Sequence, residues 1–380
     1  MNFKIIATTT FGLEAVVKRE LQDLGYENIK VTDGKVEIEG NEEDIANLNI
    51  NLRCAERVLI KFGEFKALTF DELFEKTKAL PWENIIPEDG EFPVDGKSLK
   101  SKLFSISDSQ AIVKKAIVER LKSIYNINWF EENGPKYKVE VSLLKDIATL
   151  TIDTSGDGLH KRGYRDRAGD APLKETLAAA MIKLSYWNPS RTLYDPFCGS
   201  GTILIEAAMI GKNIAPGIDR EFISQEWPII GKDIYKKYRK IALGKIDHNV
   251  KLHLLGSDTD KRSILRARDN AENIGVNEDI QFFMKDMRDV DLIDNYGVVI
   301  TNPPYGERMG EQKEIERLYK DLGKKFKDFP TWSVYLITNN EKFEKLYGKK
   351  ADRKRKLYNG RIKVDYYQFY GPRPPRQEEK

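Results

Sequence analysis

The feature that most constrains the fold is an alternation of strand-like and helical segments in the second half of the chain. Short apolar runs typical of buried strands occur at 192–195, 252–257, 280–284, 298–301 and 333–337. Apolar residues at helical spacing predict one helix before the first of these strands, at 174–187, and three helices between later ones, at 202–210, 261–274 and 315–326. This order predicts a mostly parallel α/β sheet with helices on both faces. Asn359-Gly360 predicts a terminal antiparallel hairpin, because this pair suits a two-residue turn.

The first 154 residues lack this regular alternation and are expected to form two small α+β units, 1–66 and 67–154. The second unit contains a helix that begins behind Thr69, a helix at 108–124 and two strands, with 92–97 expected as a strand followed by a turn. Thr154-Ser-Gly-Asp-Gly marks the boundary to a third domain, 155–380. Within that domain, the segment at about 211–250 interrupts the alternation of strands and helices. We interpret this segment as an insertion beside the ligand-binding edge of the sheet, where it could face a substrate.

Composition excludes several classes of protein. The chain has 380 residues, 40% of them hydrophobic and 32% charged, which predicts a globular protein of two or three domains. Two cysteines and three dispersed histidines predict neither a disulfide framework nor a metal site. No apolar stretch reaches the ~18 residues of a membrane span, and the N-terminal apolar run is too short for a signal peptide. We therefore expect a cytoplasmic protein without a membrane partner, whose oligomeric state the sequence does not reveal.

A glycine-containing loop follows the first strand of the predicted parallel sheet. The loop consists of Asp195, Pro196, Phe197, Cys198, Gly199, Ser200, Gly201 and Thr202. It lacks the third glycine of a dinucleotide fingerprint and the Gly-Lys-Ser/Thr of a P-loop. The leading carboxylate would repel a phosphate but suits an ammonium, such as the α-amino group of a methionyl moiety. Two glycines alone would favour an ordinary strand-to-helix turn without a ligand, but the full motif in this position favours a nucleoside with such a group.

Two further carboxylates follow the next two strands. Asp258 is placed to accept hydrogen bonds from both ribose hydroxyls, and Asp286, beside Met287, is placed to accept one from adenine N6. A single aspartate at the end of a strand is more often a turn or helix-cap residue than a ligand-binding residue. The succession of one acidic residue after each of three strands favours a nucleoside-binding edge.

The segment Asn302, Pro303, Pro304 and Tyr305 follows the fourth strand. Tandem prolines lack two backbone donors, so nearby carbonyls remain available as acceptors. The Asn302 side-chain oxygen and the Pro303 carbonyl could together accept both hydrogens of an exocyclic amine and direct its lone pair at a sulfonium methyl. Tyr305 offers a face for a base swung out of its stack. Cys198 has no obvious base partner, so it is interpreted as a packing residue.

Taken in order, these motifs resemble the class I S-adenosylmethionine-dependent methyltransferases, and more narrowly the THUMP-domain RNA guanine-N2 methyltransferases that modify large-subunit (23S) ribosomal RNA. Further marks of this resemblance are Thr10-Phe-Gly-Leu-Glu-Ala, the helix entry at 105–115, His160-Lys-Arg-Gly-Tyr-Arg and Ala171-Pro-Leu-Lys-Glu. The resemblance implies a ferredoxin-like segment at 1–66, a THUMP domain at 67–154 and a Rossmann-like methyltransferase domain at 155–380. It also implies S-adenosylmethionine as cofactor, an amine-recognition role for Asn302-Pro-Pro-Tyr and a covering role for Lys174.

Two basic clusters are candidate RNA contacts. Residues 345–363 carry nine basic and one acidic residues in a chain whose net charge is +3, so positive charge is concentrated there. A solvated hairpin face explains this run about as well. The candidate residues in the two clusters are Lys161, Arg162, Arg165, Arg167, Lys354, Arg355 and Lys356.

Structured RNA, with ribosomal RNA favoured, is therefore the expected partner. A guanine-N2 methyltransferase of transfer RNA and an adenine-N6 methyltransferase are the enzymatic alternatives, because Asn-Pro-Pro-Tyr suits any planar amine. A non-catalytic RNA-binding assembly factor is the alternative from another class, and the intact motif residues argue against it.

Overall fold

The computed structural model describes residues 1–165, 173–305 and 312–375 and divides into two compact units. The first unit comprises Met1–Thr9, Val17–Leu159 and Gly217–Ala242. The second comprises Thr10–Val16, His160–Pro216 and Leu243–Lys380. We describe each unit by itself.

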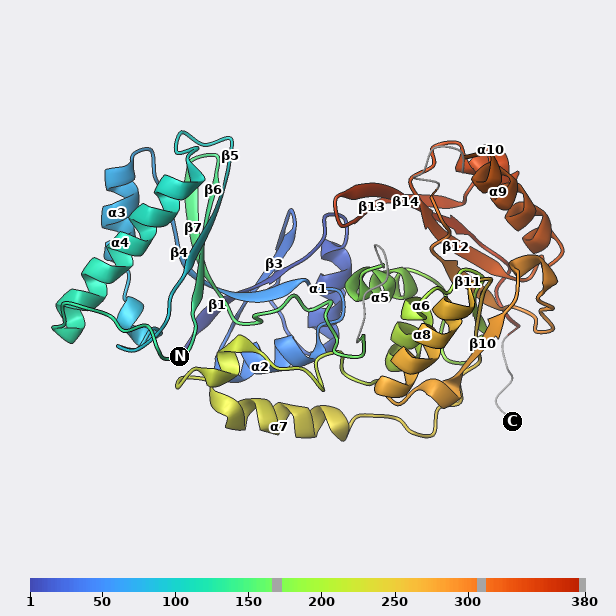
Figure 1. Ribbon diagram of the computed structural model, residues 1–380, viewed down its shortest axis with the longest axis horizontal. Coiled ribbons are helices and arrows are strands. Elements are labelled where there is room, and N and C mark those ends of the chain that lie inside the picture. The colour runs from blue at the N-terminus through green and yellow to red at the C-terminus, as the bar shows by residue number, and fades with distance from the viewer. Residues whose placement is uncertain (166–172, 306–311, 376–380) are drawn as a thin grey trace. The chain divides into compact units, whose positions relative to one another are not determined.

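A seven-stranded sheet in the order β2-β3-β1-β4-β7-β6-β5 runs through the whole first unit (Figure 1). Its strands are β1 (Phe3–Thr8), β2 (Lys30–Thr32), β3 (Lys35–Gly40), β4 (Arg57–Lys66), β5 (Val94–Leu99), β6 (Lys138–Leu144) and β7 (Ile147–Asp153). The long strand β4 pairs with β1 on one side and β7 on the other. The two α+β units expected from the sequence therefore share one continuous sheet through β4.

The helices of this half are α1 (Glu14–Asp23), α2 (Glu42–Asn51), α3 (Phe70–Lys78) and α4 (Ile106–Tyr125), with a 3₁₀ turn η1 at Trp82–Asn84. Three of them, α2, α3 and α4, begin behind the polar capping residues Asn41, Thr69 and Ser105. The Thr69 hydroxyl accepts a hydrogen bond from the Glu72 amide, 3.1 Å away, which confirms the predicted cap of α3. Helices α3 and α4 pack together, and α4 contacts β5 and β6.

The turn expected within 92–97 is wrong, because Asp95-Gly96-Lys97 lies inside β5 and pairs in parallel with β6. A glycine is needed at position 96 because α4 crosses close to the strand and leaves little room for a side chain. A Cβ at Gly96 would lie 3.0 Å from Gln110 Cγ of α4. The glycine thus reports a close helix–strand contact rather than a turn.

Much of the predicted insertion belongs to the first unit rather than to the domain in which the sequence places it. Gly217–Ala242 packs there and includes the 3₁₀ turn η2 (Ile223–Glu226) and most of helix α7 (Gly231–Leu243). Trp227 is fully buried and its ring stacks on Tyr137 with centroids 4.6 Å apart. The Asn49 side-chain amide donates to the Tyr235 hydroxyl at 3.1 Å. Buried aromatic packing and a buried hydrogen bond therefore hold the segment.

The second unit contains the mostly parallel sheet that the sequence predicts. Its order is β10-β9-β8-β11-β12-β14-β13, with β10 to β12 parallel and β14 and β13 antiparallel. The strands are β8 (Leu193–Asp195), β9 (Leu254–Asp258), β10 (Ile280–Met284), β11 (Val298–Thr301), β12 (Ser333–Thr338), β13 (Arg353–Asn359) and β14 (Ile362–Phe369). The expected hairpin is confirmed: Asn359 pairs with Ile362, and Gly360 has φ +62°.

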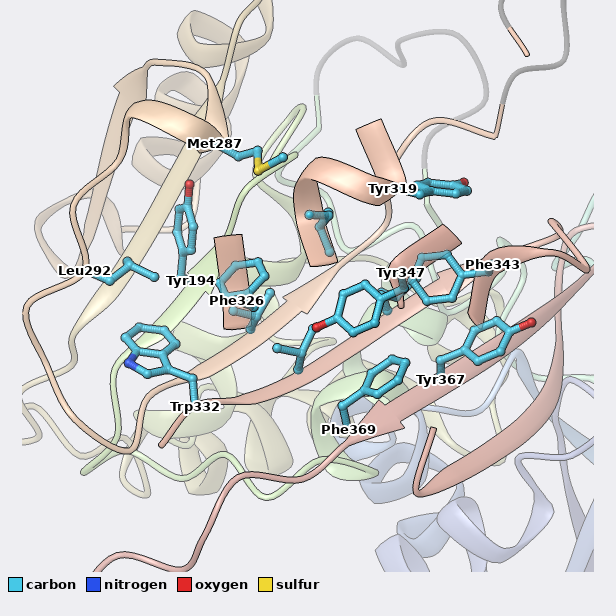
Figure 2. Packing of buried hydrophobic residues seen from close by; sticks show 14 of the residues in the cluster. Tyr194, Met287, Leu292, Tyr319, Phe326, Trp332, Phe343, Tyr347, Tyr367 and Phe369 are labelled. Carbon is cyan, nitrogen blue, oxygen red and sulfur yellow. The ribbon is translucent and has the colours of Figure 1, made fainter. Parts of the chain in front are cut away.

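Five helices belong mainly to this unit, α5 (Glu175–Lys183), α6 (Thr202–Gly211), α8 (Lys261–Asn273), α9 (Gln312–Lys327) and α10 (Phe343–Tyr347), with 3₁₀ turns η3 (Asn277–Asp279) and η4 (Met287–Asp289). Figure 2 shows the aromatic cluster beneath α9 and α10, to which Tyr319, Phe343 and Phe369 contribute. A Cβ at Gly323 would lie 2.0 Å from the Tyr347 carbonyl oxygen, so close packing of α9 on α10 requires this glycine. Within the described ranges, no helix is long and apolar enough to cross a membrane.

Candidate active site

Four polar side chains predicted to bind ligand follow four neighbouring strands of the parallel sheet. Asp195 ends β8, Asp258 ends β9, Asp286 lies just beyond β10, and Asn302 directly follows β11. Because these strands are parallel and adjacent in the order β10-β9-β8-β11, their carboxyl ends meet at one edge. The order reverses around β8, and such a switch point is where open α/β sheets bind ligands.

Asp195 is a buried carboxylate, 1% exposed. Its Oδ1 accepts hydrogen bonds from the Thr301 hydroxyl at 2.6 Å and the Phe197 amide at 3.1 Å. Burial, more than its neighbour Asp258, raises the pKa of Asp195 from 3.8 to about 7, even though both hydrogen bonds lower it. Within the described residues no cationic side chain pairs with it. The site therefore contains a carboxylate that a positively charged ligand group would stabilise.

The loop after Asp195 depends on its two glycines. Gly199 has φ +52° and Gly201 has φ +82°, in the left-handed region that other residues rarely adopt. A Cβ at Gly199 would meet nothing within 4 Å, whereas one at Gly201 would lie 3.1 Å from Ala267 Cβ. Gly199 thus leaves open space, while Gly201 permits close packing at the start of α6. The Gly199 amide donates to Asp258 Oδ2 at 3.0 Å, which ties the loop to the neighbouring strand end.

Other loop residues are held by contacts that the sequence does not reveal. Cys198 is buried, and burial, followed by the nearby carboxylates, raises the pKa of its thiol well above the usual value, as expected for a packing residue. The Ser200 carbonyl accepts a hydrogen bond from the Asn270 side chain of α8 at 2.9 Å. Ser257 donates to the Pro196 carbonyl at 3.4 Å. Asn270 has no local motif that could have identified it, whereas Ser257 directly precedes Asp258 at the end of β9.

Asp286 already has a cationic partner. The Arg288 guanidinium donates to both of its carboxylate oxygens, at 2.8 and 2.7 Å, and this contact lowers the pKa of Asp286. Oδ1 also accepts a hydrogen bond from the Arg288 backbone amide at 2.9 Å, so Oδ2 is the oxygen that retains a lone pair for a ligand amine. Met287, by contrast, is 2% exposed and contributes its side chain to the aromatic cluster (Figure 2). A role for Met287 toward a ligand would therefore involve its backbone.

The Asn302–Tyr305 segment is held by two tyrosine hydroxyls. Tyr305 donates to Asn302 Oδ1 at 2.6 Å, and Tyr319 of α9 donates to the Pro304 carbonyl at 3.0 Å. A hydrogen bond to Oδ1 fixes which way the amide points, so that its oxygen, which has a second lone pair, remains an acceptor. The sequence identifies Tyr305 as a ring that stacks but does not show that its hydroxyl contacts Asn302.

The predicted basic cluster at 161–167 is largely structural. Arg162 is 2% exposed and forms an ion pair with the buried Glu206 at 3.3 Å, so the RNA-contact prediction for this residue is wrong. Arg165 pairs with Glu175 at 3.0 Å and donates to the hydroxyl of Thr202 in the glycine-containing loop. Burial of these guanidinium groups against carboxylates explains why a basic run in the sequence is not a basic surface here.

Three further residues of this region are predicted to contact RNA or the cofactor. Lys161 is exposed, and Arg167 lies outside the described residues. Lys174 is half-buried and directly precedes α5.

The hairpin residues divide between two faces of β13. Lys354 pairs with Asp365 at 3.1 Å, and Lys356 lies over the Tyr358 ring with its Nζ 5.4 Å from the centroid. Arg355 points to the other face and donates to the Gly12 carbonyl at 3.2 Å. Arg355 is therefore held in an intramolecular contact, whereas the two lysines are exposed on the edge strand of the sheet.

Comparison with known proteins decides the family. Residues 162–368 match the model for the RMKL-like methyltransferase domain, 4–59 the RlmL ferredoxin-like domain and 67–153 the THUMP domain. The chain belongs to the RMKL-like methyltransferases. It is 52% identical over 380 residues to the Bacillus subtilis (strain 168) protein named "Putative RNA methyltransferase YpsC", with coverage of 100% of this chain and 98% of that protein.

Solved structures agree with this assignment. A Listeria monocytogenes protein described as a predicted N6-adenine-specific DNA methylase has 51% identity and a TM-score of 0.94, with 98% of this chain and 97% of that chain covered. SMU.472, crystallised with S-adenosylhomocysteine (SAH), has 46% identity and a TM-score of 0.93, with 98% and 99% covered. The protein is thus a class I methyltransferase that uses S-adenosylmethionine.

The site fits that cofactor. The buried Asp195 carboxylate lacks a cationic partner among the described residues, and the α-ammonium group of the cofactor would supply one. The open space at Gly199 accommodates a nucleoside close to the backbone. Among the described residues there is no cluster of three metal-ligating side chains.

Proposed function

We propose that this methyltransferase methylates guanine N2 in ribosomal RNA. The observation that carries the proposal is the position of Asn302-Pro-Pro-Tyr305, directly after β11 and beside the strand that ends in Asp195. The presence of a THUMP domain and of a ferredoxin-like domain of the RlmL type supports RNA, and ribosomal RNA in particular. The name of the Bacillus relative, an RNA methyltransferase, also supports RNA as substrate.

The proposed cofactor contacts come from the strand ends. Asp195 would pair with the α-ammonium, Asp258 would accept from the ribose hydroxyls, and Asp286 would accept from the adenine amine. Residues 196–202 would line the cofactor, the Met287 backbone would contact the adenine, and Lys174 would contribute to the cover. S-adenosylmethionine supplies an electrophilic methyl group on a sulfonium. The protein's contribution is to orient cofactor and target amine in line, since positioning alone lowers such a barrier substantially.

On the substrate side, Asn302 Oδ1 and the Pro303 carbonyl accept the two hydrogens of the target amine. The Tyr305 hydroxyl keeps the Asn302 amide in the accepting orientation, because it donates to the same oxygen at 2.6 Å. The Tyr305 ring stacks on the extruded base, a contact worth ~1–3 kcal/mol. Transfer of the methyl from sulfur to nitrogen forms an N–C bond, breaks an S–C bond and releases one proton from the amine.

Adenine N6 is the second candidate for the target. The Listeria structure is described as an adenine-specific methylase, and the same pair of acceptors would hold the N6 amine. Nucleoside mass spectrometry of ribosomal and transfer RNA from a strain lacking the gene separates these possibilities. We expect N2-methylguanosine to disappear from one fragment of large-subunit RNA and to return with the wild-type gene but not with Asn302→Ala. Loss of N6-methyladenosine instead, loss from transfer RNA alone, or no loss of either nucleoside would refute the proposal.

The hairpin lysines are proposed RNA contacts, together with Lys161. Lys354→Glu/Lys356→Glu should weaken RNA binding and reduce the salt slope of log K by ~0.7–0.9 for each lost phosphate contact. A matched control is Lys245→Glu/Lys251→Glu, which makes the same charge change at two exposed lysines of the same unit. Filter binding at several salt concentrations measures both quantities. If the two double variants behave alike, the hairpin lysines only protect an edge strand from pairing with another chain.

A further inference from the structure

The exposed face of α9 carries a continuous row of cations. Its members occur at intervals of four, three, four and three residues, which places them on one face of the helix: Lys313, Arg317, Lys320, Lys324 and Lys327. All five are exposed, while Ile315, Tyr319, Leu322 and Phe326 of the opposite face are buried. We call this row the α9 basic stripe.

The α9 basic stripe is poorly neutralised. Among the described residues its one ion pair joins Lys324 to Asp321 at 3.9 Å, and the Lys324 side chain is 81% exposed. Within the described part of the chain the other four cations have no acidic partner. Lys325 shows the contrast, because it points away from the stripe and donates to the Val290 carbonyl at 2.6 Å. A row of cations without acidic partners is typical of a surface that binds a polyanion. An ordinary solvated helix has positive and negative charges that alternate along its face.

A cavity of about 610 Å³ opens at the C-terminal end of the stripe. Its lining includes three stripe lysines, Lys349 and the aromatic residues Phe329 and Tyr370. Lys349 Nζ lies 6.0 Å from the Phe369 ring centroid, so positive charge and aromatic surface adjoin in the cavity wall. Trp332, Tyr347 and Phe369, which are labelled in Figure 2 as part of the buried cluster, also line this cavity. Proteins that bind single-stranded nucleic acids combine positive charge with aromatic rings. The cations contact the phosphates, and the bases stack on the rings.

The stripe is physically connected to the candidate active site. Tyr319, on the buried face of α9, donates to the Pro304 carbonyl of the amine-recognition segment and is hydrogen-bonded to Thr338 at 2.9 Å. At 1.5 Å per residue, the stripe extends ~21 Å from Lys313 to Lys327. A strand that delivers a base to Asn302 could therefore continue along α9 to the cavity.

From the stripe, the cavity and this connection we infer that α9 binds single-stranded RNA flanking the target nucleotide, with one unstacked base in the cavity between α9, α10 and β14. The inference rests on the proposed function, in that it concerns the RNA substrate of the same enzyme. It adds a binding surface beyond the cofactor edge and the hairpin lysines.

The test compares two triple variants of the full chain. Lys320→Glu/Lys324→Glu/Lys327→Glu reverses the stripe, and Lys232→Glu/Lys236→Glu/Lys240→Glu makes the same change at three exposed lysines of α7. The probe is a fluorescein-labelled single-stranded RNA of mixed sequence, about 20 nucleotides long. We expect the stripe variant to bind at least about tenfold more weakly, with a salt slope lower by ~2 because three contacts at ~0.7 each are lost. SAH affinity should not change in either variant.

Photocrosslinking locates the bound bases. RNA containing 4-thiouridine should crosslink to peptides that include Phe329 or Tyr370 in the wild type, and less in the stripe variant. Equal affinity and slope in the two triple variants, or crosslinks that all lie elsewhere, would overturn the inference. The proposed function is tested separately by methylation of ribosomal RNA from the deletion strain. If the wild type does not methylate that RNA but the stripe still binds single strands, the proposed function fails and the inference about α9 remains.

Discussion

Cofactor binding should depend on pH through Asp195. Its carboxyl is buried, accepts hydrogen bonds from Thr301 and Phe197, and has its pKa raised to about 7 by burial. Only the ionised form can pair with an ammonium group. Lowering the pH therefore protonates Asp195 before the ligand binds, and binding must then release that proton.

The size of this effect follows from the pKa. With a pKa of about 7, roughly 3% of Asp195 is ionised at pH 5.5 and roughly 75% at pH 7.5, so cofactor affinity should rise about 25-fold over this interval. The range stops at pH 7.5 because α-amino groups themselves titrate near ~7.7–8.0. Near pH 6, binding should release about 0.9 proton, since Asp195 is mostly protonated before and ionised after binding.

The same group affects the stability of the protein without cofactor, with a definite sign. Between pH 3.8 and about 7 the folded protein retains this proton while the unfolded chain has lost it, so the free energy of unfolding falls as pH rises. At about 1.4 kcal/mol per pH unit, the loss amounts to about 4 kcal/mol by pH 7.5. Asp195→Asn retains an oxygen acceptor for Thr301 but cannot ionise. It should therefore unfold at a higher temperature than the wild type at pH 7.5, and at nearly the same temperature at pH 4.5.

Two measurements check this reasoning. Calorimetric titration with SAH at pH 5.5, 6.5 and 7.5, in buffers of different ionisation enthalpy, gives both the affinity and the protons released. Thermal unfolding of the wild type and Asp195→Asn from pH 4.5 to 7.5 gives the stability difference. A wild-type affinity independent of pH, or an Asn variant that binds the cofactor normally or is less stable at pH 7.5, would refute the assignment of Asp195 as the buried partner of the ammonium.

The remaining predictions concern the amine-recognition segment and the buried ion pair. Asn302→Ala should reduce the single-turnover methylation rate by orders of magnitude while SAH affinity stays nearly unchanged, and an equal loss of SAH affinity would contradict its role on the substrate side. Tyr305→Phe keeps the ring and loses only the hydrogen bond that orients Asn302, so it should lose part of the activity, whereas Tyr305→Ala should additionally lose the ~1–3 kcal/mol of stacking. Equal damage in the two variants would assign the whole role to the hydroxyl and none to the ring. Glu206→Ala leaves the Arg162 charge buried and unpaired and should lower the free energy of unfolding by about 3–5 kcal/mol, visible as a reduced midpoint in denaturant. An unchanged midpoint would show that Arg162 reaches solvent.

Local patterns determined most of the second unit and the positions of its candidate ligand residues. Strand and helix periodicity predicts the parallel sheet, and each predicted ligand side chain follows a strand, so their meeting at one edge is a consequence of parallel topology. Asn359-Gly360 predicts the hairpin for a similar reason, since the turn is encoded in two residues. These inferences succeed because the information that they need lies within a few residues of each element.

Tertiary structure alone decided the features that depend on residues far apart in the chain. Arg162 belongs to a basic run, but Glu206, 44 residues later, turns it into half of a buried ion pair. The sequence places Trp227 in a loop insertion of the methyltransferase domain, but its ring stacks on Tyr137 and the segment belongs to the first unit. The sequence marks Asp195 as a ligand residue, yet its raised pKa arises only because folding removes water from it without supplying a cation. Burial and charge pairing arise only when distant segments of the chain pack together, so no local sequence pattern predicts them.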